Sequence, residues 1–148
     1  QGMGAHDDRG WSGGAHLVLR PELHLGRRGG GDLGAGPYLE GGGHFSSRGP
    51  GGILGGGALL LIPLGRANAL VPSLGGYATF GQELGLQPGV TGGLFLGARQ
   101  FNPTSRFDGA WGLRLDLRWG LGTAHEVVAA LGFQVDLSWL GALLSWAL

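Results

Sequence analysis

The residues Phe107 to Leu121 read FDGAWGLRLDLRWGL, and their alternation decides the fold class. From Trp111 to Leu121, every second residue is leucine or tryptophan. The charged residues of the stretch all fall on even positions: Asp108, Arg114, Asp116 and Arg118. Successive side chains of a β-strand point to opposite faces. The stretch therefore predicts a strand with one apolar wall and one charged wall.

The whole chain is poor in charge and rich in glycine. Only 14% of its residues are charged, against about a quarter in an ordinary soluble domain, while 43% are hydrophobic and 35 of 148 are glycine. A soluble domain would need far more charged side chains to cover its outside. Low charge combined with the alternation predicts one β-barrel domain whose outside faces lipid and whose inside is polar.

Several function classes are excluded by composition. The formal net charge is zero, whereas a nucleic-acid partner requires a basic surplus, so we expect no nucleic-acid partner. Cysteine is absent, which excludes disulfides and thiolate metal sites. No apolar stretch reaches the roughly 18 residues that a membrane-spanning helix needs. We expect neither a cofactor nor a bound metal.

A period of two predicts seven strands along the chain. They cover residues 15–25, 33–45, 53–64, 70–82, 90–101, 107–121 and 127–139. The connections are short and carry glycine, proline and asparagine, which favours turns between antiparallel neighbours in an up-and-down order. The stretch Ile53 to Leu64 is apolar on both faces, so its pattern does not show which residues point inward.

The roles of the two terminal segments are predicted from the expected strand count and from composition. Outer membrane barrels normally have an even number of strands, so an eighth strand is expected at Gly141 to Leu148, after a turn at Leu140 and Gly141. A C-terminal helix, or an edge that pairs with another chain, remains open. Residues 1–10 are polar and predict a flexible leader before a barrel over 11–148, with Gln1 as the start of a mature exported chain.

The charged positions of the predicted strands form one inward set. An eight-stranded barrel is only wide enough inside to be filled by side chains, and buried opposite charges must pair. We therefore expect a plugged, salt-bridged lumen, with a narrow ion or water path as the alternative. The expected interior network is Arg20, Glu22, Glu40, Arg99, Asp108, Arg114, Asp116, Arg118 and Asp136, with His16, His24 and His44 nearby.

Aromatic residues near the strand ends predict two girdles at the membrane interfaces. In the expected topology four of them share one end and two share the other. The first group is Trp11, Phe45, Phe80 and Trp119, and the second is Phe107 and Trp139.

Repeats such as AHLVLRPELHL and WGLRLDLRWGL resemble those of the small outer membrane β-barrel proteins of Gram-negative bacteria, the porin-like superfamily with its eight-stranded members. The resemblance covers Trp11 to Leu148. It implies an antiparallel up-and-down transmembrane β-barrel, integral to the bacterial outer membrane and in contact with its lipid and lipopolysaccharide. Short loops on both rims and the absence of catalytic motifs favour a structural or accessory role, which includes a subunit of a larger envelope assembly with a protein partner. Members commonly end in an aromatic residue, whereas this chain ends Ser145-Trp146-Ala147-Leu148.

One short string points to an enzyme instead. His44-Phe45-Ser46 resembles the His-x-Ser element of outer membrane lipid A deacylases, which would make His44 the base, Ser46 the nucleophile and Glu40 the orienting acid. That element lies toward the C-terminus in the family, but in the first third of this chain. The competing interpretation is an ordinary loop serine after a strand-end histidine. We do not expect an enzyme.

Three further hypotheses remain. His6, Asp7 and Asp8 could hold a metal, although such a cluster in a leader is more often solvated. Three arginines expected on one rim could contact lipid phosphates: Arg27, Arg28 and Arg66. A soluble, lipocalin-like ligand-binding barrel would require the same alternation turned inside out, with the charged wall facing water.

Overall fold

The computed structural model of the chain describes residues 2–7, 10–27, 29–46, 49–65, 67–81, 85–99, 110–122 and 126–135. Residues 2–7, 10–13 and Ser46 are described as backbone only. Within these ranges the extended elements are β-strands. They are β1 (Gly2–Asp7), β2 (Gly10–Leu19), β3 (Gly34–Ser46), β4 (Gly49–Pro63), β5 (Asn68–Gly81), β6 (Gly85–Arg99), β7 (Ala110–Gly120) and β8 (Val127–Val135).

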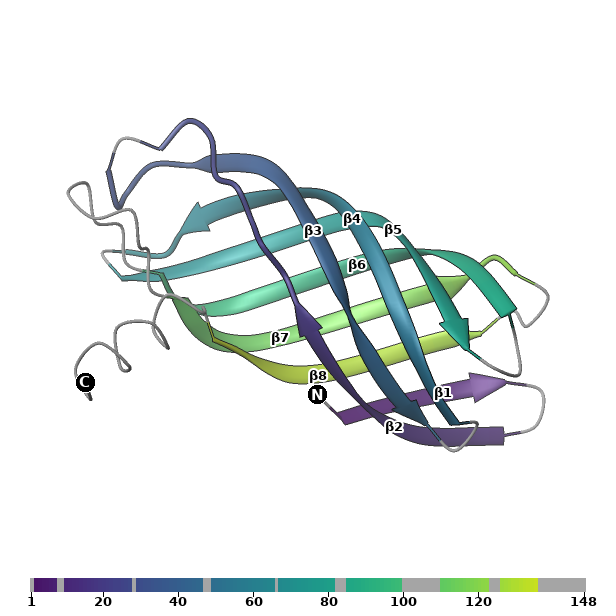
Figure 1. Cartoon of the computed structure of the whole chain (residues 1–148). Coiled ribbons are helices and arrows are strands. Elements are labelled where there is room, and N and C mark those ends of the chain that lie inside the picture. Colours follow the sequence, from purple (N-terminus) through teal and green to yellow (C-terminus); the bar gives the residue numbers. More distant parts are fainter. Residues whose placement is uncertain are drawn as a thin grey trace, which may run out of the picture.

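The strands form one antiparallel sheet in chain order, and this sheet curls round on itself (Figure 1). Each strand pairs with the next along the chain, and β1 also pairs with β8, which closes the barrel. The all-β, antiparallel, up-and-down arrangement predicted from the sequence is therefore confirmed. The seven predicted strands correspond in order to β2 through β8, whereas the strand expected at 141–148 lies outside the described residues.

The barrel has two unlike rims. At the turn rim, on the right of Figure 1, β3 and β4 are joined by only two residues, 47–48, and β5 and β6 by three, 82–84. At the loop rim, on the left, the connection from β2 to β3 covers residues 20–33. Two isolated bridges continue the β2–β3 pairing there, Glu22 with Tyr38 and Leu25 with Ala35. These two names are used below for the two ends.

The N-terminal segment differs from its predicted role as a leader. Gly2–Asp7 forms β1, paired with Gly10 to Ala15 of β2 on one side and with β8 on the other. The segment lacks an apolar alternation, so the periodicity did not reveal it. Backbone hydrogen bonds to two neighbours do not depend on side-chain pattern, which is why a glycine-containing polar segment can still form a strand.

Side chains alternate between an apolar outside and a mixed inside. Along β7, Arg114, Asp116 and Arg118 are buried, while Trp111 and Trp119 are more than half exposed. The interior also contains an apolar cluster contributed by β3 to β6. Its members are Tyr38, Leu59, Leu61, Ala69, Val71 and Phe95. No helix long and apolar enough to cross a membrane occurs among the described residues.

Candidate functional site

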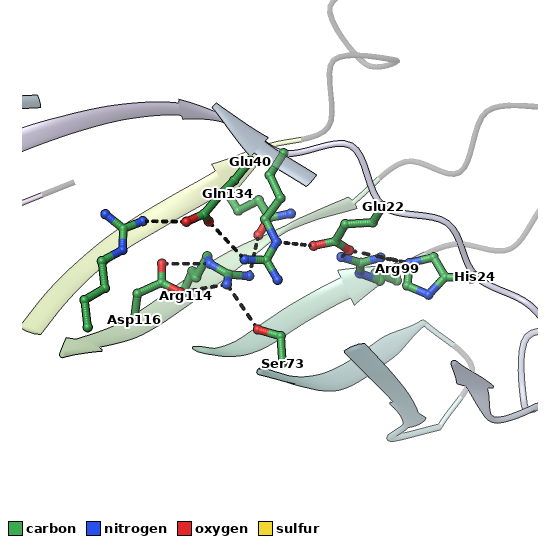
Figure 2. A network of polar contacts seen from close by, with 10 residues as sticks. Glu22, His24, Glu40, Ser73, Arg99, Arg114, Asp116 and Gln134 are labelled. Atoms are coloured by element: carbon green, nitrogen blue, oxygen red, sulfur yellow. Dashed lines mark hydrogen bonds and ion pairs between the residues drawn. The ribbon is translucent and has the colours of Figure 1, made fainter. Parts of the chain in front are cut away.

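Charged side chains of β3, β6, β7 and the segment that follows β2 meet inside the barrel, where Glu40 lies at the centre of the group (Figure 2). Arg118 donates from Nη2 to Oε1 of Glu40 at 3.3 Å. Arg20 donates from Nη1 to the other oxygen, Oε2, at 3.4 Å. Both carboxylate oxygens of Glu40 are thus occupied by arginines from opposite sides.

The chain of contacts continues from Arg20 toward the loop rim. Arg20 Nε donates to Glu22 Oε1 at 3.0 Å, and the second oxygen of Glu22 accepts from Arg99 Nη2. Arg99 Nη1 in turn contacts Nε2 of His24 (Figure 2). Glu22 therefore bridges two arginines in the same manner as Glu40.

Toward the turn rim the contacts end in two histidines. Arg118 Nη1 lies 2.8 Å from Nδ1 of His16, and the rings of His16 and His44 are 5.7 Å apart between centroids. An arginine can only donate, so Nδ1 of His16 accepts. The charged chain therefore runs the length of the barrel in alternating order: His16, Arg118, Glu40, Arg20, Glu22, Arg99 and His24. We call this set the charge chain.

Arg114 forms a second cluster beside the charge chain. Its Nε and Nη2 atoms donate to the two oxygens of Asp116 at 2.8 and 2.6 Å, which is the bidentate geometry that arginine forms with carboxylates. Arg114 also donates to Ser73 Oγ at 3.3 Å and to Gln134 Oε1 at 3.4 Å. The guanidinium thereby links β5, β7 and β8 across the lumen.

Interior glycines make room for these side chains. Glu40 lies opposite Gly55 in the β3–β4 register, and a Cβ atom on Gly55 would stand 2.9 Å from Glu40 Cγ. Asp116 lies opposite Gly93 in the β6–β7 register, and a Cβ on Gly93 would stand 2.4 Å from Arg114 Nη2. Part of the high glycine content thus has a local reason, because a narrow lumen holds a large side chain only where its neighbour has none.

The arginines outnumber the carboxylates in this part of the lumen. Four arginines face three carboxylates in the charge chain and the Arg114 cluster, those of Glu22, Glu40 and Asp116. Aromatic rings lie beside two of the arginines in addition to the carboxylates. The guanidinium of Arg20 lies 3.4 Å from the ring centroid of Tyr38, and that of Arg99 lies 4.9 Å from Phe95. Aromatic faces attract such cations, most strongly where water is excluded.

The structure brings together most of the interior residues named from the sequence. Arg20, Glu22, Glu40, Arg99, Arg114, Asp116 and Arg118 are in contact as described, while Asp108 and Asp136 lie outside the described residues. Sequence reasoning did not include Ser73 or Gln134 in the network. Both occupy the polar face of their predicted strands, and this position could have placed them inside the barrel. Only the closed barrel shows that they reach Arg114.

The aromatic residues of the first predicted girdle lie at one end. Phe45, Phe80 and Trp119 are exposed near the turn rim, where Trp11 of β2 also lies in the backbone register. Phe107 and Trp139 fall outside the described residues. An outward pair that the sequence analysis did not assign to a girdle lies toward the loop rim, where Trp111 and Phe133 have ring centroids 6.3 Å apart.

Among the described residues, the contacts do not assemble the hydrolase or metal sites suggested by the sequence. His44 points into the barrel near the turn rim, but Glu40, its hypothetical orienting acid, has both oxygens bound to arginines. Nothing is described of the Ser46 side chain, so the hydrolase remains a hypothesis. The side chains of His6, Asp7 and Asp8, and residues Arg28 and Arg66, also lie outside the description. Among the described residues, no group of three or more histidines and carboxylates could hold a metal.

The chain matches none of the protein-family models, curated proteins or solved structures with which it was compared.

Proposed function

We propose that this chain is an integral β-barrel protein of the bacterial outer membrane with a structural or accessory role. The observation that carries the proposal is the direction of its side chains. Along β7, the charged residues Arg114, Asp116 and Arg118 point inward, and large apolar residues point outward. Exposed leucines, valines and aromatics continue over β2 to β8. An apolar outside of this extent is expected where the solvent is lipid.

The strand lengths suit a bilayer. β7 has 11 residues. At about 3.4 Å per residue and a tilt of about 40°, such a strand spans roughly 28 Å, which is close to the apolar band of about 25 Å on outer membrane barrels. Exposed aromatics near both rims, with Trp119 at one and Trp111 toward the other, support two lipid–water interfaces.

The interior favours a closed barrel over an open pore. The charge chain fills one side of the lumen with paired ions, and the apolar cluster around Leu61 and Phe95 fills the other. A barrel of this size encloses little more than its own side chains. Lipid and lipopolysaccharide would be the contacts of the outer wall, and a protein partner in an envelope assembly would act through the same wall or the rims. The likeness to small Gram-negative outer membrane barrels is part of this proposal.

A soluble ligand-binding barrel would require the side chains of its strands to face the opposite way. In that arrangement Arg114, Asp116 and Arg118 would face water and the leucines would line a cavity, whereas these three residues are the buried ones. The orientation of β7 therefore supports the membrane barrel and not the lipocalin-like alternative.

A charge introduced at different depths on the outer wall tests the proposal. Leu115 lies outward at the middle of β7, and Leu121 lies outward just beyond its end at the turn rim. We expect Leu115→Arg to make insertion into lipid vesicles less favourable by about 2–4 kcal/mol, and Leu121→Arg by about 0–1 kcal/mol. Folding is followed by gel migration with and without boiling and by circular dichroism.

A soluble protein would give a different result. Its outer charges would face water, so Leu115→Arg would be neutral or would raise solubility, with no dependence on depth. Stable folding without detergent, together with equal behaviour of the two arginine variants, would contradict the membrane assignment.

A further inference from the structure

Two hydrogen-bond donors remain unused inside the barrel, where Arg20 stacks on Tyr38. The guanidinium carbon of Arg20 lies 3.4 Å from the centroid of the Tyr38 ring. Both side chains are deeply buried, because the side chain of Arg20 is 6% exposed and Tyr38 is 2% exposed. Nη2 of Arg20 and the hydroxyl of Tyr38 have no hydrogen-bond partner among the described residues. A buried donor without a partner costs about 1–3 kcal/mol, and more on a charged group, so an acceptor is favoured here.

The Tyr38 hydroxyl reaches β5, two strands away from its own strand. In the sheet register, Tyr38 lies opposite Gly57 of β4, and Gly57 lies opposite Gly75 of β5. A Cβ atom on Gly75 would stand 2.4 Å from the hydroxyl oxygen, so only glycine leaves room for it. Ser73, which accepts from Arg114, is the next inward residue on β5, about 7 Å along the strand. The hydroxyl therefore lies near the Arg114 cluster as well as the charge chain.

The charge of this region favours an anion over a neutral molecule. Among the described residues, four guanidinium groups face three carboxylates there. The histidines of the charge chain add no positive charge, because Nδ1 of His16 lies against Arg118 and Nε2 of His24 lies against Arg99. An arginine can only donate, so both nitrogens accept and both rings are neutral. One positive charge is left over, and a buried charge without a counterion costs several kcal/mol.

We propose that one compact monovalent anion, of the size of chloride, binds between Nη2 of Arg20 and the hydroxyl of Tyr38. The guanidinium supplies the charge, and the hydroxyl supplies a second donor at the edge of the ring. A water molecule would accept from both donors but would leave the surplus charge unbalanced. A larger anion does not fit, because side chains fill a barrel of this width. The inference goes beyond the proposed function, since it depends on the closed lumen and not on the lipid outside.

The dependence of stability on chloride tests the site. The full chain is unfolded with urea in non-ionic detergent micelles and followed by tryptophan fluorescence. Sodium chloride replaces sodium fluoride at constant ionic strength, from about 10 to about 300 mM chloride. Fluoride is smaller and therefore harder to dehydrate. Because a ligand that binds only the folded state stabilises it by mass action, we expect the folded-to-unfolded ratio to rise at least about fivefold. An unchanged ratio would overturn the proposal.

Two tyrosine variants separate the site from a general effect of salt. Tyr38→Phe keeps the ring beneath Arg20 and removes the hydroxyl, so its response to chloride should fall below about twofold. Tyr77→Phe is the matched control, since the Tyr77 ring lies beside a different arginine, 5.7 Å from the guanidinium carbon of Arg118. This variant should keep the full response. Equal responses of the unchanged chain and both variants would overturn the proposal.

The low-chloride end of the titration shows that Tyr38→Phe still folds. At about 10 mM chloride the site is largely empty, so this variant should match the stability of the unchanged chain to within about twofold. A much larger loss at low chloride, with the chloride response intact, would overturn the proposal, because the hydroxyl would then stabilise the barrel without the anion.

Bromide locates the ion without a variant. It has the charge of chloride and a similar size, and its anomalous X-ray scattering marks its position in crystals grown in sodium bromide. We expect a peak in contact with Nη2 of Arg20 and the Tyr38 hydroxyl. Peaks outside the barrel alone would indicate an adventitious ion only and would overturn the proposal. Both measurements use detergent-solubilised protein, so they can succeed even if the depth-dependent arginine test in vesicles fails, and the two proposals fail separately.

Discussion

The two sides of the lumen are built by different physical means. The charged side, from β3, β6, β7 and the segment that follows β2, consists of ion pairs such as Glu40 with Arg20 and Arg118. The apolar side, from β3 to β6, consists of close-packed residues such as Leu61 and Phe95, both fully buried. A buried ion requires particular partners at particular distances, whereas an apolar side chain requires only that the space be filled. We therefore expect the stability of the charged side to depend on which residues are present, and the stability of the apolar side to depend on the volume of its side chains.

The largest effect should come from removing the central carboxylate. Glu40→Gln keeps the volume but leaves the buried charges of Arg20 and Arg118 without their shared partner. Breaking a buried ion pair on one side costs about 3–5 kcal/mol, and we expect that loss in the free energy of unfolding. Urea unfolding in vesicles, followed by tryptophan fluorescence, measures it. Leu39→Ile, on the outer face beside Glu40, is the control; a loss below about 1 kcal/mol for Glu40→Gln would show that the charge chain contributes little.

A cavity on the apolar side should have the next largest effect. Leu61 is fully buried, and Leu60, its neighbour along β4, is 42% exposed. Leu61→Ala should lower stability by about 2–4 kcal/mol, because it loses apolar contacts and leaves a void. Leu60→Ala leaves no void and should cost less than half as much in the same urea titration. Equal losses would contradict the assignment of Leu61 to the interior.

The third largest effect should come from alanine at an inward glycine, Gly93, compared with its outward neighbour, Gly92. A Cβ on Gly93 would meet Arg114 Nη2 at 2.4 Å and Asp116 Oδ1 at 2.6 Å, while a Cβ on Gly92 would meet nothing within 4 Å. Gly93→Ala should therefore destabilise the barrel by about 1–3 kcal/mol, as overpacking does. Gly92→Ala should be neutral or slightly stabilising, since alanine reduces the freedom of the unfolded chain. The reverse order in thermal unfolding would mean that the Arg114 cluster can shift without cost.

The smallest effect should occur where the two sides meet. Tyr38 belongs to the apolar cluster, its ring lies under the guanidinium of Arg20, and its buried hydroxyl has no hydrogen-bond partner among the described residues. Tyr38→Phe keeps the ring and should change stability by less than about 0.5 kcal/mol. Tyr38→Leu removes the aromatic face and should cost about 1–2 kcal/mol more. If Tyr38→Phe cost as much as Tyr38→Leu, the hydroxyl and not the ring would hold Arg20.

Much of the barrel could be predicted because one face of each strand differs chemically from the other. The charges of β7 alternate with leucine and tryptophan without interruption, so the inward positions of Arg114 and Asp116 followed from the sequence. The apolar side could not be predicted in this way. Ile53 to Leu64 is apolar on both faces, and only the pairing of β4 with β3 and β5 shows that Leu59 and Leu61 point inward.

The sequence by itself determined the class of fold, the polarity of the two faces and, among the described residues, the charges that share the lumen. These features follow from a period of two, which is a local property of an extended chain. Only the tertiary structure decided which charges contact each other, how Glu40 comes to lie between Arg20, just after β2, and Arg118 of β7, and that Gly2–Asp7 joins the wall. Those contacts join residues up to about a hundred positions apart, as His16 and Arg118 are, and they exist only once the sheet has closed.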